Sequence, residues 1–235
     1  MERHARPGIF SLGITRGVIA QVFGTAIGIG LVTLIRLLVG LPAWKAEPAW
    51  VGGALVGVIA FTYGSGVLND WLKWMKGEEA PEHPVDQFPP EAGAARYLSV
   101  SYDHKVIGIQ YGITSVIMLF VAGLFALIFR TELAAPQLQF LTPELYNSLM
   151  SLHGIVMIYA ILLGVGAMSN YLVPLLIGAN DMVFPRLNAF AFWINVPAGI
   201  LLLTSLLFGG FDTGWTGYPP LSALAPLGVP FFFLG

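Results

Sequence analysis

Long apolar runs separated by shorter polar stretches are the dominant pattern along this chain. Each run holds about 20 residues, the length that a helix needs to cross a hydrocarbon core of roughly 30 Å. Helices are expected because lipid offers no hydrogen-bond partner to open backbone groups. The pattern therefore predicts an all-α integral membrane protein, a multi-helix transmembrane bundle. The five expected spans cover residues 17–40, 50–71, 106–129, 149–175 and 187–209.

A sixth apolar run begins near Leu224 and stops at Gly235, which is too short to cross a membrane. We interpret it as the start of a further span and expect a truncated or split chain. The first run is about twice as long as the core of a signal peptide, and no small-residue cleavage pattern follows it. We therefore expect it to remain as a membrane anchor.

A polar stretch at 73–105 separates the first two spans from the rest. Its prolines and acids disfavour packed structure, so we interpret it as a cytoplasmic linker. The predicted organisation is a two-helix N-terminal extension (1–72), this linker (73–105) and a core (106–235). In the extension, Gly64 and Gly66 predict close helix packing. Arg36 and Asp70 are expected to extend toward opposite membrane faces.

Composition and charge agree with a membrane protein. Hydrophobic residues make up 56% of the chain and charged residues 10%, against roughly 25% charged residues in soluble domains. The net charge of −2 provides no basic surface for nucleic acid. With a cytoplasmic N-terminus, most basic residues fall on the cytoplasmic side, as the positive-inside rule requires. Those residues are Arg3, Arg6, Arg16, Lys73, Lys76, Arg96, Lys105 and Arg186, against Lys45 and Arg130 outside.

The chain has no cysteine, so any metal must be held by nitrogen or oxygen. His153 is the one histidine expected inside a span, because His4, His83 and His104 fall in cytoplasmic segments. A neutral imidazole in lipid can ligate haem iron or form a hydrogen bond between helices. Arg130 ends the preceding span at the same outer level, an arrangement that suits a macrocycle with polar substituents.

Polar motifs follow one another in a fixed order from residue 103 onward. They are Asp103-His104-Lys105, Arg130-Thr131-Glu132-Leu133, Tyr146-Asn147, His153-Gly154, Asn170-Tyr171-Leu172-Val173-Pro174-Leu175, Asp181 through Asn188, and Gly214-Trp215-Thr216-Gly217-Tyr218-Pro219-Pro220. This series resembles helices I to III and the start of helix IV of subunit I of the haem-copper respiratory oxidases. The two helices before it have no counterpart in that pattern.

The resemblance implies roles for residues near the outer face. His153 matches one axial ligand of the low-spin haem, of type a or b, and Arg130 matches the arginine at the polar edge of that haem. Trp215 and Tyr218 match the outer loop over the oxygen-reducing haem. Glu132 and Gln139 match an outer-surface cation site of some members, whose oxygen ligands would suit Ca²⁺. An ordinary solvated glutamate is the alternative for Glu132.

On the cytoplasmic side, Asp181 matches the acid that opens the D proton pathway. Asn170 and Asn188 match the amides that order water in that pathway. The alternative is an aspartate that caps a helix beside Arg186. Ser169 stands before Asn170, where the family usually has glycine. The number of residues between His153 and Asn170 is also slightly smaller than is usual in the family. A shorter helix, or a bend near Gly164 and Gly166, is therefore expected.

As a whole, the resemblance implies part of the catalytic subunit of a terminal oxidase. Such an enzyme reduces oxygen to water with electrons from cytochrome c and pumps protons. A second, high-spin haem and copper are expected on later helices, with oxidase subunits II and III as partners, in a prokaryotic inner (plasma) membrane. The chain alone is expected to be inactive.

Two other interpretations remain open at this stage. A quinol oxidase of the same family would need polar side chains at positions that here are Val121, Phe125, Leu145 and Ser148. Those apolar and hydroxyl groups do not suit the quinol site of the bo type. The other alternative is a non-enzymatic membrane scaffold or transporter fragment, in which His153 is structural and no haem is present.

Overall fold

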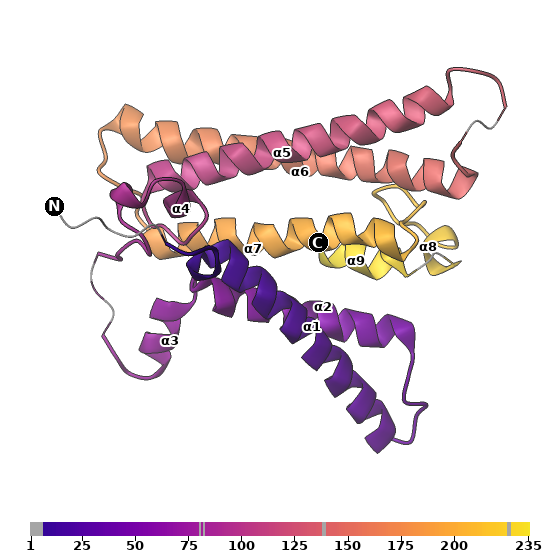
Figure 1. Cartoon of the computed structure of the whole chain (residues 1–235), viewed down its shortest axis with the longest axis horizontal. Coiled ribbons are helices and arrows are strands. Elements are labelled where there is room, and N and C mark those ends of the chain that lie inside the picture. The colour runs from indigo at the N-terminus through magenta and orange to yellow at the C-terminus, as the bar shows by residue number, and fades with distance from the viewer. Residues whose placement is uncertain (1–6, 80, 82, 138–139, 225–226) are drawn as a thin grey trace. The chain divides into compact units, whose positions relative to one another are not determined.

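The structure is a computed structural model that describes residues 7–235 except 80, 82, 138–139 and 225–226. Its described residues form helices and loops without a strand (Figure 1). The helices long and apolar enough to span a membrane are α1 (Gly13–Leu38), α2 (Ala46–Ser65), α5 (His104–Glu132), α6 (Pro143–Ile177) and α7 (Pro185–Thr204), which η3 (Ser205–Phe208) extends. The predicted class, an all-α multi-pass membrane protein, is confirmed.

Shorter elements occupy the segments between and after the spans. They are η1 (Ile9–Ser11), α3 (Asn69–Met75), η2 (Pro90–Ala92), α4 (Ala94–Tyr97), α8 (Leu221–Leu224) and α9 (Gly228–Leu234). The second span is shorter than predicted, because Gly66 adopts a left-handed φ of +92° that ends α2. Trp71 therefore belongs to the separate helix α3. The fourth span is not shortened, since α6 continues through Gly164 for 35 residues, and the alternative of a bend there stays a prediction.

The chain forms two compact units, and α5, α6 and α7 each contribute to both. The first unit comprises Met1–Tyr111 and Ala167–Ala198, and the second comprises Gly112–Gly166 and Gly199–Gly235. This division differs from the predicted three-part organisation, which stays a prediction.

In the first unit, glycines allow α1 and α2 to pack closely. A Cβ atom added to Gly28 would lie 2.8 Å from the Cα of Gly53, and one added to Gly17 would lie 2.8 Å from the ring of Phe61. Real Cβ atoms do not approach other atoms that closely, so only glycine fits. Small residues at helix contacts are typical of membrane bundles, where packing drives association.

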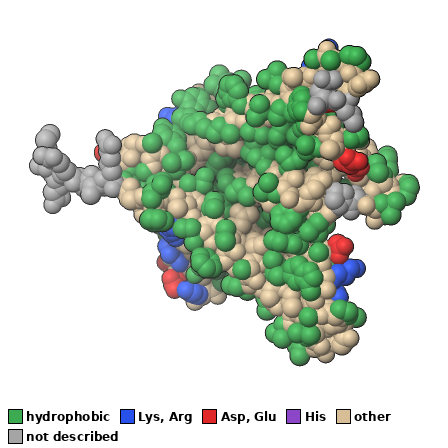
Figure 2. All heavy atoms as spheres, turned by 45° about the vertical axis from the view of Figure 1, so that its right-hand side comes forward, with side chains coloured by type: hydrophobic (Ala, Val, Ile, Leu, Met, Phe, Trp, Pro, Cys, Tyr) green, Lys and Arg blue, Asp and Glu red, His purple; other side chains and the backbone are tan. Residues whose placement is uncertain are grey.

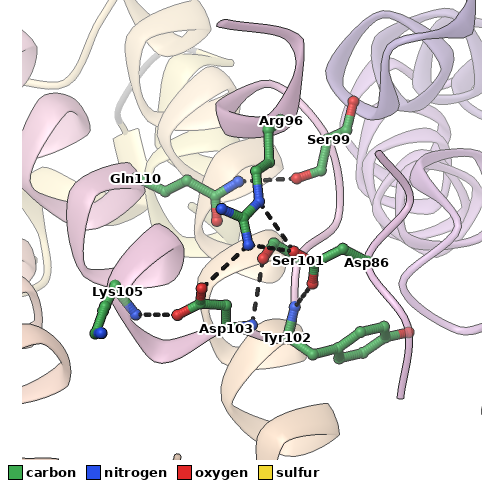
Figure 3. Close-up of polar contacts among 8 residues, drawn as sticks. All are labelled: Asp86, Arg96, Ser99, Ser101, Tyr102, Asp103, Lys105 and Gln110. Atoms are coloured by element: carbon green, nitrogen blue, oxygen red, sulfur yellow. Dashed lines mark hydrogen bonds and ion pairs between the residues drawn. The ribbon is translucent and has the colours of Figure 1, made fainter. Parts of the chain in front are cut away.

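Residues 86–105 are packed rather than an extended linker. Arg96 donates from Nε and Nη2 to Asp86 Oδ2, at 3.1 and 2.9 Å, and from Nη2 to Asp103 Oδ2 at 3.1 Å (Figure 3). The other Asp86 oxygen accepts the backbone N–H of Tyr102 at 2.7 Å. Ser99 is fully buried. The expectation that prolines and acids disfavour packed structure is wrong for residues 86–105, because Asp86 and Asp103 pair with Arg96 and also accept backbone N–H groups.

The same segment joins the helix ends of the first unit. Gly13 at the start of α1 donates its N–H to Ser99 Oγ at 3.1 Å, and Asp103 Oδ1 accepts the N–H of Lys105 at 2.8 Å, which caps α5. His104 Nδ1 lies 2.9 Å from the carbonyl oxygen of Asn170 in α6. The starts of α1 and α5 and the end of α6 thus meet at one end of this unit, as expected if they share a membrane side.

The second unit has a core built from α5, α6, α7 and α9. Its buried members are Ala122, Phe125, Leu141, Leu149, Leu152, Val156, Leu202, Phe211 and Phe232. Phe211 and Phe232 stack with ring centroids 3.8 Å apart, which fixes α9 beside the segment that follows η3. This core supports the turn of α6 that carries His153.

Hydrophobic side chains also cover much of the surface in Figure 2. Phe23, Phe120, Leu162 and Leu176 are among the large apolar residues that are more than half exposed on the spans. Apolar exposure on this scale is not stable in water and suits contact with lipid acyl chains.

Candidate functional site

His153 lies half-buried in α6 and is oriented by two groups of α5. Its Nδ1 is 2.9 Å from the carbonyl oxygen of Ala122, and its ring packs edge-on against Phe129 with centroids 5.5 Å apart. Because a carbonyl oxygen only accepts, Nδ1 must carry the proton. The lone pair of the neutral ring is therefore on Nε2.

This arrangement fits a haem ligand. Histidines that bind metals through one ring nitrogen typically donate the other N–H to a carbonyl or carboxylate, which fixes the tautomer and the ring orientation. Across the part of the chain that the structure describes, no hydrogen bond occupies Nε2 of His153. A nitrogen donor suited to haem iron is thus available on this ring.

Arg130 follows Phe129 directly in the last turn of α5 and is exposed. Phe129 also packs edge-on against Tyr146 of α6, with centroids 5.8 Å apart. The turn that carries Arg130 is thus fixed against the same helix as His153. Among the described residues its guanidinium has no hydrogen-bond or ion-pair partner, so it is available for an anionic or polar group. Its role at a haem edge stays a prediction.

Glu132 differs from the solvated glutamate considered above. It is 4% exposed, and Oε2 accepts the backbone N–H groups of Phe140 and Leu141 at 2.9 Å each. The carboxylate therefore bonds the end of α5 to the residues just before α6. Gln139 lies outside the described residues. Within the described ranges no group of three or more His, Cys, Asp and Glu side chains could hold a metal ion, and the cation site stays a prediction.

Trp215 and Tyr218 lie in the segment after η3 and are 69% and 73% exposed. This segment is attached to α6, because the N–H of Gly214 donates to Ser151 Oγ at 3.2 Å. Ser151 is two residues before His153, so the aromatic segment lies at the same end of α6 as the histidine. Contact of either ring with a second haem stays a prediction.

Asp181 and Asn188 share a cavity of about 450 Å³ at the turn between α6 and α7. The other lining residues are Val173, Pro174, Ile177, Ala179, Met182, Val183, Phe184, Leu187 and Ala191. Asp181 is exposed, and its Oδ1 accepts the N–H of Met182 at 2.7 Å. Asn188 Nδ2 is buried and has no hydrogen-bond partner in the described structure. The two groups thus provide an exposed carboxylate and a buried amide donor at one cavity.

Asn170 is not among the residues that line this cavity. It is 7% exposed, and its carbonyl oxygen accepts the Nδ1–H of His104. His104, which was expected in a cytoplasmic segment, is 2% exposed as the first residue of α5. The cap by Asp103 places His104 in the first turn of the helix, where the carbonyl of Asn170 supplies an acceptor, and its position on the cytoplasmic side stays a prediction.

Asp70 and Arg186 form an ion pair that sequence reasoning missed. Arg186 Nε donates to Asp70 Oδ2 at 2.8 Å, and both side chains are largely buried. Which membrane face Asp70 approaches stays a prediction. Arg36 instead donates to the carbonyl oxygen of Pro42 at 2.9 Å. A pair separated by 116 positions has no local sequence signal. The available signal was an acid just after one span and an arginine at the start of another, which is compatible with an ion pair between helix ends.

These features define a class: a multi-pass helical membrane protein that presents an oriented, half-buried histidine between two spans. Residues 106–235 match the protein-family model described as Cytochrome C and Quinol oxidase polypeptide I. The match covers more than half of the chain, and the chain therefore belongs to this family. The resemblance stated from the sequence is confirmed.

The chain is similar to several proteins named cytochrome c oxidase subunit 1. It is 55% identical over 130 residues to that of Thermostichus vulcanus, covering 54% of this chain and 24% of the relative. For Synechocystis sp. the identity is 53% over 130 residues, covering 55% and 24%. For Corynebacterium glutamicum it is 45% over 152 residues, covering 62% and 26%. The chain thus spans about a quarter of the length of these relatives, and α1 and α2 lie before the residues that the family model matches.

Proposed function

We propose that this chain is part of the catalytic subunit of a respiratory terminal oxidase that reduces oxygen to water with electrons from cytochrome c and pumps protons. Family membership and the names of its relatives support an oxidase. The observation that carries the proposal is the His153 ring, whose Nδ1–H donates to Ala122 and whose Nε2 is directed to no protein group in the described chain.

In this proposal, His153 would hold the low-spin haem through Nε2, while the carbonyl oxygen of Ala122 keeps the ring from rotating. The haem, of type a or b, supplies the one-electron chemistry when bound. Arg130 would offer its guanidinium to a polar group of that haem. A fixed positive charge there would stabilise added electron density and raise the reduction potential.

Asp181 has the role of cytoplasmic proton acceptor. An exposed carboxylate at the mouth of a cavity can exchange protons with the aqueous phase, and polar groups lining a wet route carry protons onward. The buried Nδ2 of Asn188 would donate to a water molecule near Asp181. That water would supply the hydrogen-bond partner that Nδ2 lacks within the described chain. Asn170, which lies further from the turn along α6, would order water in the same pathway.

The complete enzyme extends beyond this segment. A second haem and copper would be held by helices outside the chain, and the chain alone would be inactive. Subunits II and III, cytochrome c and the lipid bilayer are the proposed partners. We place the N-terminus in the cytoplasm of a prokaryote, with the spans in its plasma membrane, because the basic residues gather on that side.

The quinol alternative is less well supported. Phe125 is 9% exposed within the core of the second unit, and Val121 packs against the same core. Both side chains are committed to apolar packing and offer no donor or acceptor to a quinol headgroup.

The complete purified protein tests the proposal through its reduced-minus-oxidised optical spectrum. Bands of a- or b-type haem, with oxygen consumption driven by reduced cytochrome c, are the expected result. Oxidation of quinol but not of cytochrome c would favour the quinol oxidase. Absence of haem would contradict both oxidases and favour the scaffold.

A further inference from the structure

One face of α7 is held by residues that precede the family match. Arg186 Nε donates to Asp70 at 2.8 Å, and the Arg186 guanidinium lies 5.1 Å from the centroid of the Trp74 ring. Phe190 and Trp71 pack with centroids 6.2 Å apart. These contacts join α3, which follows the two N-terminal spans, to the first turns of α7.

A further contact comes from α2 itself. Phe61 is fully buried and packs against Trp193, with ring centroids 6.2 Å apart. Arg186, Phe190 and Trp193 are spaced by four and three residues, so they lie on one face of the helix. The first two turns of α7 therefore have a continuous contact face that belongs to the N-terminal extension.

The ion pair is the polar centre of this contact. Side-chain exposure is 10% for Asp70 and 15% for Arg186, so neither charge is well solvated. Lys73 Nζ lies 3.5 Å from the other Asp70 oxygen, and Arg186 Nη2 donates to the carbonyl oxygen of Pro81. Removing the Asp70 charge would leave a buried guanidinium without its carboxylate, which is strongly unfavourable.

The contact lies at the end of the turn that carries Asp181. This turn leaves α6 at Gly178, which has a left-handed φ of +69°, and enters α7 at Pro185. Arg186 is the second residue of α7, so Asp70 fixes the far end of the turn. Asn188, which lines the cavity with Asp181, is one half-turn further along the same helix.

We propose that the two-helix extension is a clamp that holds the turn between α6 and α7 in the conformation needed for proton uptake, with Asp70 as its positioning residue. The proposal rests on the proposed role of Asp181. It gives a function to helices that the family model does not match. It needs no direct contact between Asp70 and Asp181, because Arg186 transmits the constraint along the backbone.

Hydrogen-deuterium exchange in the complete oxidase complex tests the clamp without relying on activity. Asp70→Asn should increase exchange several-fold in peptides covering residues 179–188. The matched control is Asp86→Asn, which breaks another acid–arginine pair of the same unit, at Arg96, and should leave exchange in 179–188 unchanged. Unchanged exchange in Asp70→Asn would overturn the clamp.

A second variant keeps the test decisive where Asp70→Asn fails to fold. Trp71→Leu removes the ring contact with Phe190 but retains the ion pair. It should increase exchange in the same peptides by a smaller factor, and the absence of any increase would overturn the proposal.

Proton uptake separates this proposal from the proposed function. Asp70→Asn should slow proton uptake while the optical spectrum of the haems is unchanged, and Asp70→Glu should restore part of the rate. If Asp181→Asn blocks uptake but Asp70→Asn leaves its rate unchanged, the clamp is overturned and the role of Asp181 stands. If Asp181→Asn has no effect on uptake, the proposed function of that residue fails instead.

Discussion

The Nδ1 atom of His153 lies 2.9 Å from the carbonyl oxygen of Ala122, and this bond joins α6 to α5 at the site proposed for haem. It uses a carbonyl oxygen within a helix, at a residue that is itself fully buried. The bond determines which nitrogen carries the proton and leaves the lone pair on Nε2, the atom proposed to bind haem iron.

Replacing Asp181 with asparagine should suppress proton pumping and slow turnover in the complete enzyme. The amide cannot exchange a proton with the aqueous phase, so the rate of proton uptake should fall on the order of tenfold or more. Uptake can be followed with a pH-sensitive dye after a pulse of oxygen. The matched control is Glu91→Gln, an exposed acid of η2. Equal uptake rates in the two variants would contradict the assignment.

Replacing Asn188 with leucine should slow proton uptake. Nδ2 of Asn188 is a buried donor without a protein partner in the described structure. The change removes the amide proposed to hold water beside Asp181, and leucine offers that water no hydrogen bond. Dye-based uptake measures the effect, and an uptake rate equal to that of the unsubstituted protein would exclude a role for the amide in holding water.

Replacing Arg96 with leucine should destabilise the first unit by about 2–3 kcal/mol, since two carboxylates lose their partner. Burial alone would lower the pKa of Arg96, but its bonds to Asp86 and the charges of Asp86 and Asp103 raise that pKa above its usual value. Denaturant unfolding in detergent measures the loss. Arg36→Leu, which breaks one bond to the Pro42 carbonyl, is the control and should cost less than 1 kcal/mol.

Tyr102 should make stability fall at high pH. Burial, and next the negative charge of Asp70, raise the pKa of Tyr102 to about 12. The unfolded phenol ionises near pH 10. The folded state thus favours the protonated phenol, and this contribution is complete below about pH 10 and is lost as the pH rises to about 12. Tyrosinate absorbance of the protein minus that of Tyr102→Phe measures the pKa, and ionisation near 10 would contradict the packing of this residue.

The sequence predicts the spans because apolar length is a property of each segment alone. Their exact limits depend on single residues, such as Gly66, whose left-handed conformation ends α2 and assigns Trp71 to another helix. Capping by Asp103 likewise brings His104 into α5. A hydropathy pattern does not contain these details.

Long-range pairs explain most of what the sequence did not predict. The ion pair of Asp86 and Arg96 stabilises packed structure in a proline-rich stretch. Asp70 pairs with Arg186, which is 116 positions away in the sequence. Each of these residues alone is an ordinary surface charge. The bond of His153 to a neighbouring helix was predictable, because an ionisable group within an apolar span requires a partner.

Replacement of His153 by alanine in the complete protein tests the central claim most directly. Electron paramagnetic resonance of the oxidised enzyme distinguishes low-spin from high-spin haem iron. His153→Ala should abolish the low-spin signal, whereas His83→Ala, at an exposed position before α4, should preserve it. Retention of the full low-spin signal in His153→Ala would contradict the assignment of His153 as a haem ligand.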